Sequence, residues 1–116
     1  MTGELSFFEI GTGDVARVQA FYSGLFGWEF AVTEGGASIT TPNVPGGVHP
    51  QDAGASPYLF FAVDDLEAAI ARVQDLGGSA DPMGESDDQA AQFGRFALCA
   101  DDQGSPFGLH ERPSAA

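Results

Sequence analysis

An internal repeat constrains this chain more than any other feature of its sequence. The segment from Phe7 to Trp28 recurs in altered form about fifty-one residues later, at Tyr58 to Gly78. Under that offset Asp14 aligns with Asp65 and Gly27 aligns with Gly78. A chain of 116 residues, 43% of them hydrophobic, has enough apolar material for one compact core. We therefore expect one domain at 1–116 that is built from two copies of one module.

The first copy, at about 5–49, has the pattern of a strand, a helix and three further strands. Residues 6–11 alternate in hydrophobicity as a strand does. Asp14 is placed to cap a helix whose apolar residues recur at helical spacing, and Gly27 is placed to end it in a left-handed conformation. Strands are then expected at 28–33, 37–41 and 46–49, with a hairpin at 34–36.

The same order returns at about 58–111, after a linker at 50–57 that is rich in Gly, Ala, Pro and Ser. A strand at 58–63 precedes a helix in which Asp64 and Glu67 have capping-box spacing and Gly77 and Gly78 mark the end. Residues 79–83, 95–100 and 106–111 read as strands. The segment 84–93 reads as an acidic loop.

The charge of the chain excludes several classes of function. Seventeen acidic residues against four arginines give a net charge of −13, and a field of this sign repels nucleic acid and anionic lipid. The absence of lysine removes Schiff-base and P-loop chemistry. The acidity favours a neutral or cationic ligand, or it serves solubility alone.

The absence of certain sequence features bears on the cellular location of the protein and on disulfide bonds and structural zinc sites. No apolar run is long enough for a membrane span and no signal pattern precedes the first strand, so we expect a cytoplasmic protein with no membrane partner. A single cysteine, Cys99, makes no internal disulfide, and no Cys/His cluster has zinc spacing. We expect Cys99 to be a small buried thiol.

Three segments, FFEI…D…AFYSGLFGW, VDDLEAAIARVQDLGG and GRFALCADDQGSPFGLHE, together resemble the glyoxalase/bleomycin-resistance/extradiol-dioxygenase superfamily, also called vicinal oxygen chelate (VOC) proteins. The resemblance covers nearly the whole chain. It implies an α+β fold, with two βαβββ modules forming one VOC domain around a shared cavity and the helices outside. Single-domain members commonly pair, and open sheet edges give a reason for pairing, so we expect a homodimer.

Strand alternation predicts which side chains line the implied cavity. Residues of the parity of Phe8 and Ile10 should pack beneath the helices. The opposite parity gives the candidate ligand pocket, to which we add Arg95 and Trp28, although ordinary core packing is the alternative for Trp28. The candidate pocket residues are Phe7, Glu9, Trp28, Tyr58, Phe60, Arg95, Gly108 and His110.

The resemblance implies a metal held by the first and last strands of the modules, but the residues at those positions are poor ligands. The positions seven residues before Asp14 and Asp65 hold Phe7 and Tyr58, and the position seven residues after Asp101 holds Gly108. The last strand of the first module, 46–49, has no carboxylate. We therefore expect no cofactor; a divalent transition metal on a displaced site of Glu9, His49 and His110 is the alternative.

These expectations favour a metal-free protein that binds a small aromatic or cationic molecule, similar in kind to the bleomycin-resistance proteins, with no catalytic residue assigned. A lyase, isomerase or dioxygenase with a displaced metal site is the alternative. Glu9 is the most informative pocket residue. A carboxylate between Phe7 and Phe60 would have a raised pKa, be open to water, or pair with Arg95 or with a ligand's amine.

Overall fold

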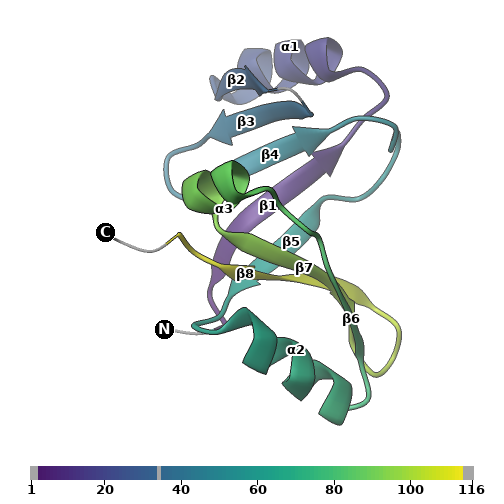
Figure 1. Ribbon diagram of the computed structural model, residues 1–116. Helices are drawn as coiled ribbons and strands as arrows, with labels where there is room; N and C mark the ends of the chain where they lie inside the picture. Colours follow the sequence, from purple (N-terminus) through teal and green to yellow (C-terminus); the bar gives the residue numbers. More distant parts are fainter. Residues whose placement is uncertain (1–2, 34, 114–116) are drawn as a thin grey trace. The chain divides into compact units, whose positions relative to one another are not determined.

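A computed structural model describes residues 3–33 and 35–113 (Figure 1). The chain divides into two compact units, one made of Phe7–Tyr58 and the other of the chain up to Ser6 and from Leu59 onward. The elements in chain order are β1 (Leu5–Gly11), α1 (Val15–Phe26), β2 (Glu29–Thr33), β3 (Gly36–Thr40), β4 (Gly46–His49), β5 (Tyr58–Ala62), α2 (Leu66–Asp75), β6 (Ser79–Pro82), α3 (Asp87–Phe93), β7 (Arg95–Ala100) and β8 (Pro106–Glu111).

The first unit carries four strands in the order β2-β3-β4-β1. β2 pairs with β3 and β3 pairs with β4 in antiparallel fashion, whereas β1 and β4 run parallel. In the parallel pair Glu9 lies opposite Gly47, and Gly11 lies opposite His49. Helix α1 connects the parallel strand β1 to the β2–β3 hairpin. Glu34, part of the expected hairpin turn, lies outside the described residues.

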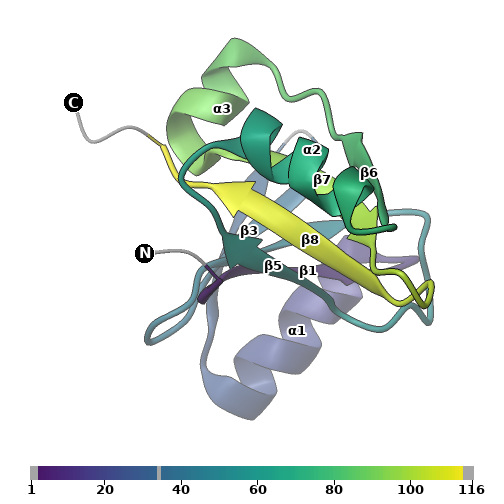
Figure 2. The ribbon, with the colours of Figure 1, turned by 90° about the horizontal axis from the view of Figure 1, so that it is seen from below.

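The second unit repeats this plan with the strand order β5-β8-β7-β6. β5 and β8 run parallel, and the other two pairs are antiparallel. Phe60 lies opposite Gly108, and Ala62 lies opposite His110. Helix α2 packs across β6, β7 and β8 (Figure 2). The expected α+β class with two βαβββ modules is therefore confirmed.

Each unit has its own apolar core beneath its helix. In the first unit the buried residues are joined by partly buried aromatic side chains, and in the second unit the helix α2 covers a core of small and branched side chains. The first core contains Ile10, Ala37, Ile39 and Val48. The second core contains Leu66, Ala97, Cys99 and Leu109. Ile10 and Leu109 thus lie on the helix-covered faces, as the alternation predicts.

The helix ends follow local signals in the sequence, with one correction. Asp14 accepts a hydrogen bond from the Arg17 backbone N–H, and Gly27 ends α1 at φ 75°, so both expected caps are confirmed. The cap of α2 is Asp65, not Asp64: the Asp65 side chain accepts from the Ala68 backbone N–H. This matches the repeat, in which Asp65 is the counterpart of Asp14.

The segment 84–93 is not a loop throughout, because α3 occupies Asp87–Phe93. Its start is fixed by a capping box. Ser86 accepts from the Gln89 backbone N–H, and the Gln89 side chain accepts from the Ser86 backbone N–H. Asp87 and Asp88 in the first turn also favour the helix N-terminus. The expectation of an acidic loop was wrong. It relied on the acidic composition of the segment and did not consider the capping box at Ser86, which starts a helix.

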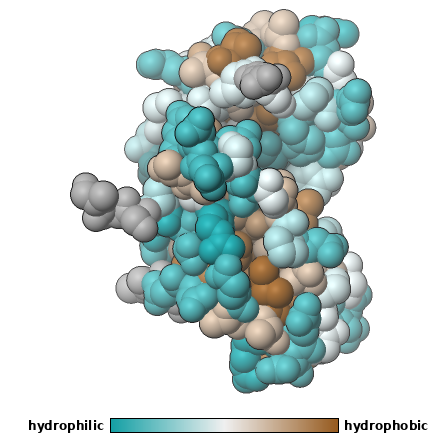
Figure 3. All heavy atoms as spheres, in the orientation of Figure 1, coloured by the Kyte–Doolittle hydropathy of each residue, from teal (hydrophilic) through white to brown (hydrophobic). Residues whose placement is uncertain are grey.

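Several large apolar side chains stay at the surface. Figure 3 shows apolar side chains exposed over α1 and β2. On α1, Phe21 is 62% exposed and both Leu25 and Phe26 are 58% exposed. Across residues 3–33 and 35–113, no helix has the length and apolar character needed to cross a bilayer.

Candidate functional site

A network of polar side chains lies on the face of the first unit that α1 does not cover. His49, at the end of β4, is its centre. The Nδ1 atom of His49 lies 3.1 Å from Glu9 Oε1, and its Nε2 atom lies 2.8 Å from Asp52 Oδ2. The Tyr58 hydroxyl donates to the same Asp52 oxygen over 2.9 Å. We call Glu9, His49, Asp52 and Tyr58 the His49 network.

The backbone after β4 brings Asp52 back to His49. Gln51 adopts φ 61°, a left-handed conformation that turns the chain sharply. The turn is held against the end of β1, since the Thr12 N–H donates to the His49 carbonyl and the Asp52 N–H donates to the Thr12 carbonyl. Asp52 therefore belongs to the site although it lies in the expected linker.

Two glycines leave the space that the side chains of this network occupy. A Cβ atom on Gly47 would lie 2.5 Å from Glu9 Oε2, and a Cβ atom on Gly11 would lie 2.7 Å from Asp52 Oδ2 and 2.8 Å from the Asp52 backbone oxygen. Real Cβ atoms do not approach so closely. The side chain of Glu9 and the turn at Asp52 thus occupy space that any other residue at 47 or 11 would fill.

The network shifts the proton affinities of its members. Burial raises the pKa of Glu9, and the hydrogen bond and charge of His49 only partly oppose this shift. For His49, burial acts to lower the pKa, but the hydrogen bonds and charges of Asp52 and Glu9 outweigh it and raise the pKa above its ordinary value. The pKa of Asp52 is lowered by hydrogen bonds from His49 and Tyr58. The pKa of Tyr58 is raised by its bond to Asp52.

His110 is the counterpart of His49 in the second unit, two residues after Gly108 as His49 is two residues after Gly47. Its environment differs. His110 Nε2 lies 2.7 Å from the Phe93 carbonyl and its Nδ1 lies 2.8 Å from Ser6 Oγ. A carbonyl only accepts, so Nε2 carries the proton. Burial lowers the pKa of His110, and its ring stacks on Phe96.

The displaced metal site of Glu9, His49 and His110 gains no support from these contacts. Both ring nitrogens of His110 already have partners, and the ring is 3% exposed. The ring of His49 lies between two carboxylates, with one on each nitrogen.

The positions at which the resemblance implies a metal do not fit one. Phe7 is buried and cannot coordinate, and the hydroxyl of Tyr58 is engaged with Asp52. Gly108 has no ligating side chain, and a Cβ atom there would overlap the ring of Phe60, which is 1% exposed. The strand register makes Gly47 the counterpart of Gly108 in the first unit, where Glu9 fills the space. These residues offer no donor set for a transition metal.

Two expected pocket residues lie on other faces. Arg95 does not pair with Glu9: its guanidinium forms an ion pair with Glu67 of α2 and lies 3.7 Å from Glu111, on the helix-covered face of β7. Trp28 stacks on Tyr22 at 5.5 Å and contacts Phe8, within the aromatic packing beneath α1. Their assignment to the face of Glu9 is therefore corrected.

β7 faces the opposite way from the one that the placing of Arg95 in the candidate pocket requires. Ala97 and Cys99 share the parity of Arg95, and both pack in the core beneath α2. Phe96 occupies the opposite face, where it contacts Phe60 edge-on at 5.2 Å. The expectation of a small buried thiol at Cys99 is confirmed, and burial raises its pKa.

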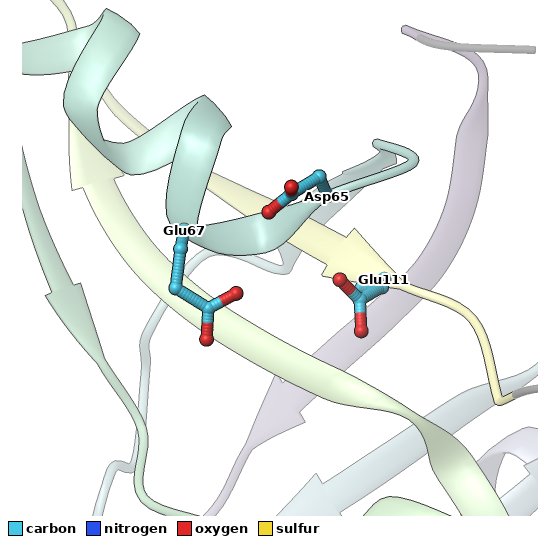
Figure 4. Close-up of side chains that lie close together, drawn as sticks. All are labelled: Asp65, Glu67 and Glu111. Atoms are coloured by element: carbon cyan, nitrogen blue, oxygen red, sulfur yellow. The ribbon is translucent and has the colours of Figure 1, made fainter.

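Within the described part of the chain, one group of carboxylates lies close enough together to hold a metal: Asp65, Glu67 and Glu111 (Figure 4). Sequence reasoning did not identify this group. Asp65 caps α2, Glu111 accepts from the Leu66 backbone N–H over 2.9 Å, and Glu67 pairs with Arg95. These contacts give each carboxylate a structural role at the start of α2.

Comparison with known proteins identifies the family of this chain. Residues 7–110 match the family described as a Glyoxalase-like domain. The anthracycline biosynthesis protein DnrV of Streptomyces peucetius is 29% identical over 132 residues, which include 92% of this chain and 46% of the relative. The chain thus spans about half the length of the curated relatives it matches.

Solved structures agree on the fold. A hypothetical protein from Bacillus halodurans superposes with a TM-score of 0.72 at 14% identity, covering 98% of this chain and 97% of that one. Methylmalonyl-CoA epimerase from Mycobacterium tuberculosis superposes with a TM-score of 0.68 at 18% identity, covering 96% of this chain and 88% of that one. At these identities the similarity concerns architecture.

Proposed function

Because this chain belongs to the Glyoxalase-like domain family, we propose that it binds a small aromatic, cationic molecule without using a transition metal. The observation that carries this proposal is the environment of the Glu9 carboxylate. Its side chain is 21% exposed, and its carboxylate lies 3.1 Å from the Nδ1 atom of His49. A positively charged group of a ligand is the natural second partner of such a carboxylate.

The residue types at the family's metal positions support the same proposal. Phenylalanine and glycine replace ligands at positions 7 and 108, so polarisation of a bound oxygen by a metal has no support from these side chains. Binding without metal chemistry remains the function that the donor set favours. The aromatic ring of Tyr58 lies 5.6 Å from the ring of His49, and it offers a flat surface beside the carboxylates.

The net charge supports a cationic ligand. With a formal charge of −13, the protein attracts cations over a range of about 10 Å at moderate ionic strength. Anthracyclines unite a planar ring system with, in many members, an amino group. The relative DnrV is an anthracycline biosynthesis protein, so this class is the first choice of probe.

Isothermal titration with doxorubicin, which carries a primary amine, and with its uncharged aglycone tests the proposal. We expect one doxorubicin per chain and at least tenfold weaker binding of the aglycone. Glu9→Gln should weaken doxorubicin binding about tenfold, the loss of one charge-assisted hydrogen bond. Glu29→Gln removes the same formal charge at an exposed position of β2 and should leave affinity unchanged.

Two results would contradict the proposal. One is the absence of binding across a panel of cationic aromatic compounds. The other is a stoichiometric transition metal in protein purified without chelators, which would favour a lyase, isomerase or dioxygenase of this family. Elemental analysis of the purified protein decides between binding and metal-dependent catalysis.

A further inference from the structure

The geometry of the His49 network fixes how many protons it holds. His49 Nδ1 and Nε2 are both within hydrogen-bond distance of a carboxylate oxygen, at 3.1 Å and 2.8 Å. An ionised carboxylate only accepts, and a neutral imidazole has one N–H to donate. Both contacts are hydrogen bonds only when the network carries one further proton, on His49 or on Glu9.

The surroundings retain this proton. The groups that act on the network are its own members: Glu9 from β1, His49 from β4, Asp52 from the turn that follows, and Tyr58 from β5. Tyr58 donates to Asp52, which keeps Asp52 ionised and leaves the further proton to Glu9 and His49. Burial raises the pKa of Glu9, and the hydrogen bonds and charges of Asp52 and Glu9 outweigh burial and raise the pKa of His49, so both shifts favour retention of the proton.

The counterpart in the second unit lacks this arrangement. His110 donates to the Phe93 carbonyl and has the Ser6 hydroxyl on its other nitrogen, so a neutral ring satisfies both of its contacts. Glu9 is replaced there by Phe60. The stored proton is therefore specific to the first unit, where it balances one of two carboxylates.

We propose that the His49 network is a proton-exchange site for organic cations, in which a bound ammonium group takes over the negative charge of Glu9 and the further proton leaves. Before binding, Glu9 and Asp52 are ionised and His49 is protonated, with a net charge of −1. After binding, the ammonium pairs with Glu9, His49 is neutral, and one proton passes to the solvent. The net charge of the occupied site is again −1, so no carboxylate is left uncompensated in a partly buried position.

This exchange rests on the proposed function for its ligand class, but it makes its own prediction. Since the cation and the proton compete, affinity rises with pH by up to about tenfold per unit below the midpoint of His49 and levels off above it. A neutral ligand of the same shape shows no such dependence. If Glu9 were an ionised carboxylate that shared no proton with His49, the cation would bind without release of a proton.

Benzylammonium is a suitable probe, with benzyl alcohol as its uncharged analogue. Histidine side-chain ¹⁵N shifts should show His49 protonated on both nitrogens in the free protein at pH 6.5 and neutral at saturating benzylammonium. His110 is an internal reference. Its ring should stay neutral throughout, with the proton on Nε2 and none on Nδ1. Titration calorimetry in buffers of different ionisation enthalpy should give close to one proton released per benzylammonium below the His49 midpoint.

Two variants make the test specific. His49→Gln retains a side chain of hydrogen-bonding character, and it should bind benzylammonium with proton release near zero and an affinity that varies less than twofold between pH 6 and 8. Glu9→Gln should lose binding by about tenfold, while Glu29→Gln behaves as wild type.

The exchange is overturned if His49 is neutral in the free protein at pH 6.5, or if benzylammonium fails to displace its proton. Doxorubicin binding without proton release also overturns it and leaves the proposed function intact. The converse result, proton-releasing binding of benzylammonium but no binding of doxorubicin or other aromatic cations, overturns the proposed ligand class and leaves the exchange intact.

Discussion

Gly47 lies directly opposite Glu9 in the parallel pairing of β1 and β4, and the Glu9 carboxylate covers it so closely that a Cβ atom would lie 2.5 Å from Oε2. Gly108 has the same relation to Phe60 in the pairing of β5 and β8. Each module therefore uses a glycine in its last strand to admit a side chain from its first strand. The first module admits a carboxylate and the second an aromatic ring, which makes the first the polar half of the fold.

Gly47→Ala should displace Glu9 at little cost in stability. The atoms that a Cβ would meet are the flexible end of the Glu9 side chain, so the carboxylate can swing away. His49 then loses one of its two acceptors, and the pH midpoint of its imidazole should fall towards the ordinary value while Asp52 remains bound. Proton NMR titration measures this shift. Gly24→Ala, which meets open space on α1, is the control and should leave the midpoint in place.

Gly108→Ala should be far more harmful than Gly47→Ala. The atoms in the way belong to the ring of Phe60, which is 1% exposed and packed against Phe96. A ring in that position has nowhere to move, and overpacking of a core costs about 1–3 kcal/mol or more. Urea denaturation measures the loss of stability. Equal stability of the two alanine variants would contradict the difference that we draw between the modules.

The two histidines should give opposite pH dependences of stability. The pKa of His49 is raised in the folded state, so its contribution is present below about pH 6.5 and is lost as pH rises through the folded value. The pKa of His110 is lowered, so its contribution is present above about pH 6.5 and is lost as pH falls through the folded value. His49→Gln should therefore destabilise the protein more at pH 5.5 than at pH 8. Urea denaturation at both pH values checks this, and the reverse order would refute the charge state assigned to His49.

Ser6→Ala should destabilise the second unit. Ser6 is 4% exposed and its hydroxyl is the partner of His110 Nδ1, so its removal leaves a buried acceptor without that bond. Such a loss costs about 1–3 kcal/mol. Ser38→Ala is the control, because the Ser38 hydroxyl makes an exposed contact of 3.5 Å to the Ala31 carbonyl. A thermal melt of both variants should show a clear loss for the first and almost none for the second.

The sequence was sufficient for the fold because each element has local signals. β4, β7 and β8 begin and end where alternation and turn residues predict, and Asp14 and Gly27 cap α1 as expected. The faces of β7 could not be predicted in this way. Phe96, Ala97 and Cys99 are all buried, so β7 has apolar residues on both faces and alternation does not distinguish them.

The candidate site was only partly predictable. Glu9 was identified because a carboxylate in an alternating apolar strand is unusual, and His49 because histidines are few. Asp52 was missed, since its position depends on the left-handed turn at Gln51 and on hydrogen bonds to Thr12. No periodicity in the sequence determines such a turn. The spacing His49-x-x-Asp52, followed by Tyr58, is the sequence signal from which Asp52 could have been found.

The exposed apolar face of α1 bears on assembly, and we expect it to be buried in a homodimer. Phe21 and Leu25 are both more than half exposed in the single chain, and burying one such side chain contributes about 1.5–3 kcal/mol. Phe21→Glu should therefore raise the dimer dissociation constant more than tenfold, as measured by analytical ultracentrifugation. Leu76→Glu places the same charge on a residue that is 61% exposed at the end of α2, and it should leave assembly unchanged. A wild-type mass of one chain at micromolar concentration would contradict the dimer, and equal weakening by both variants would show that added charge, rather than the α1 face, controls association.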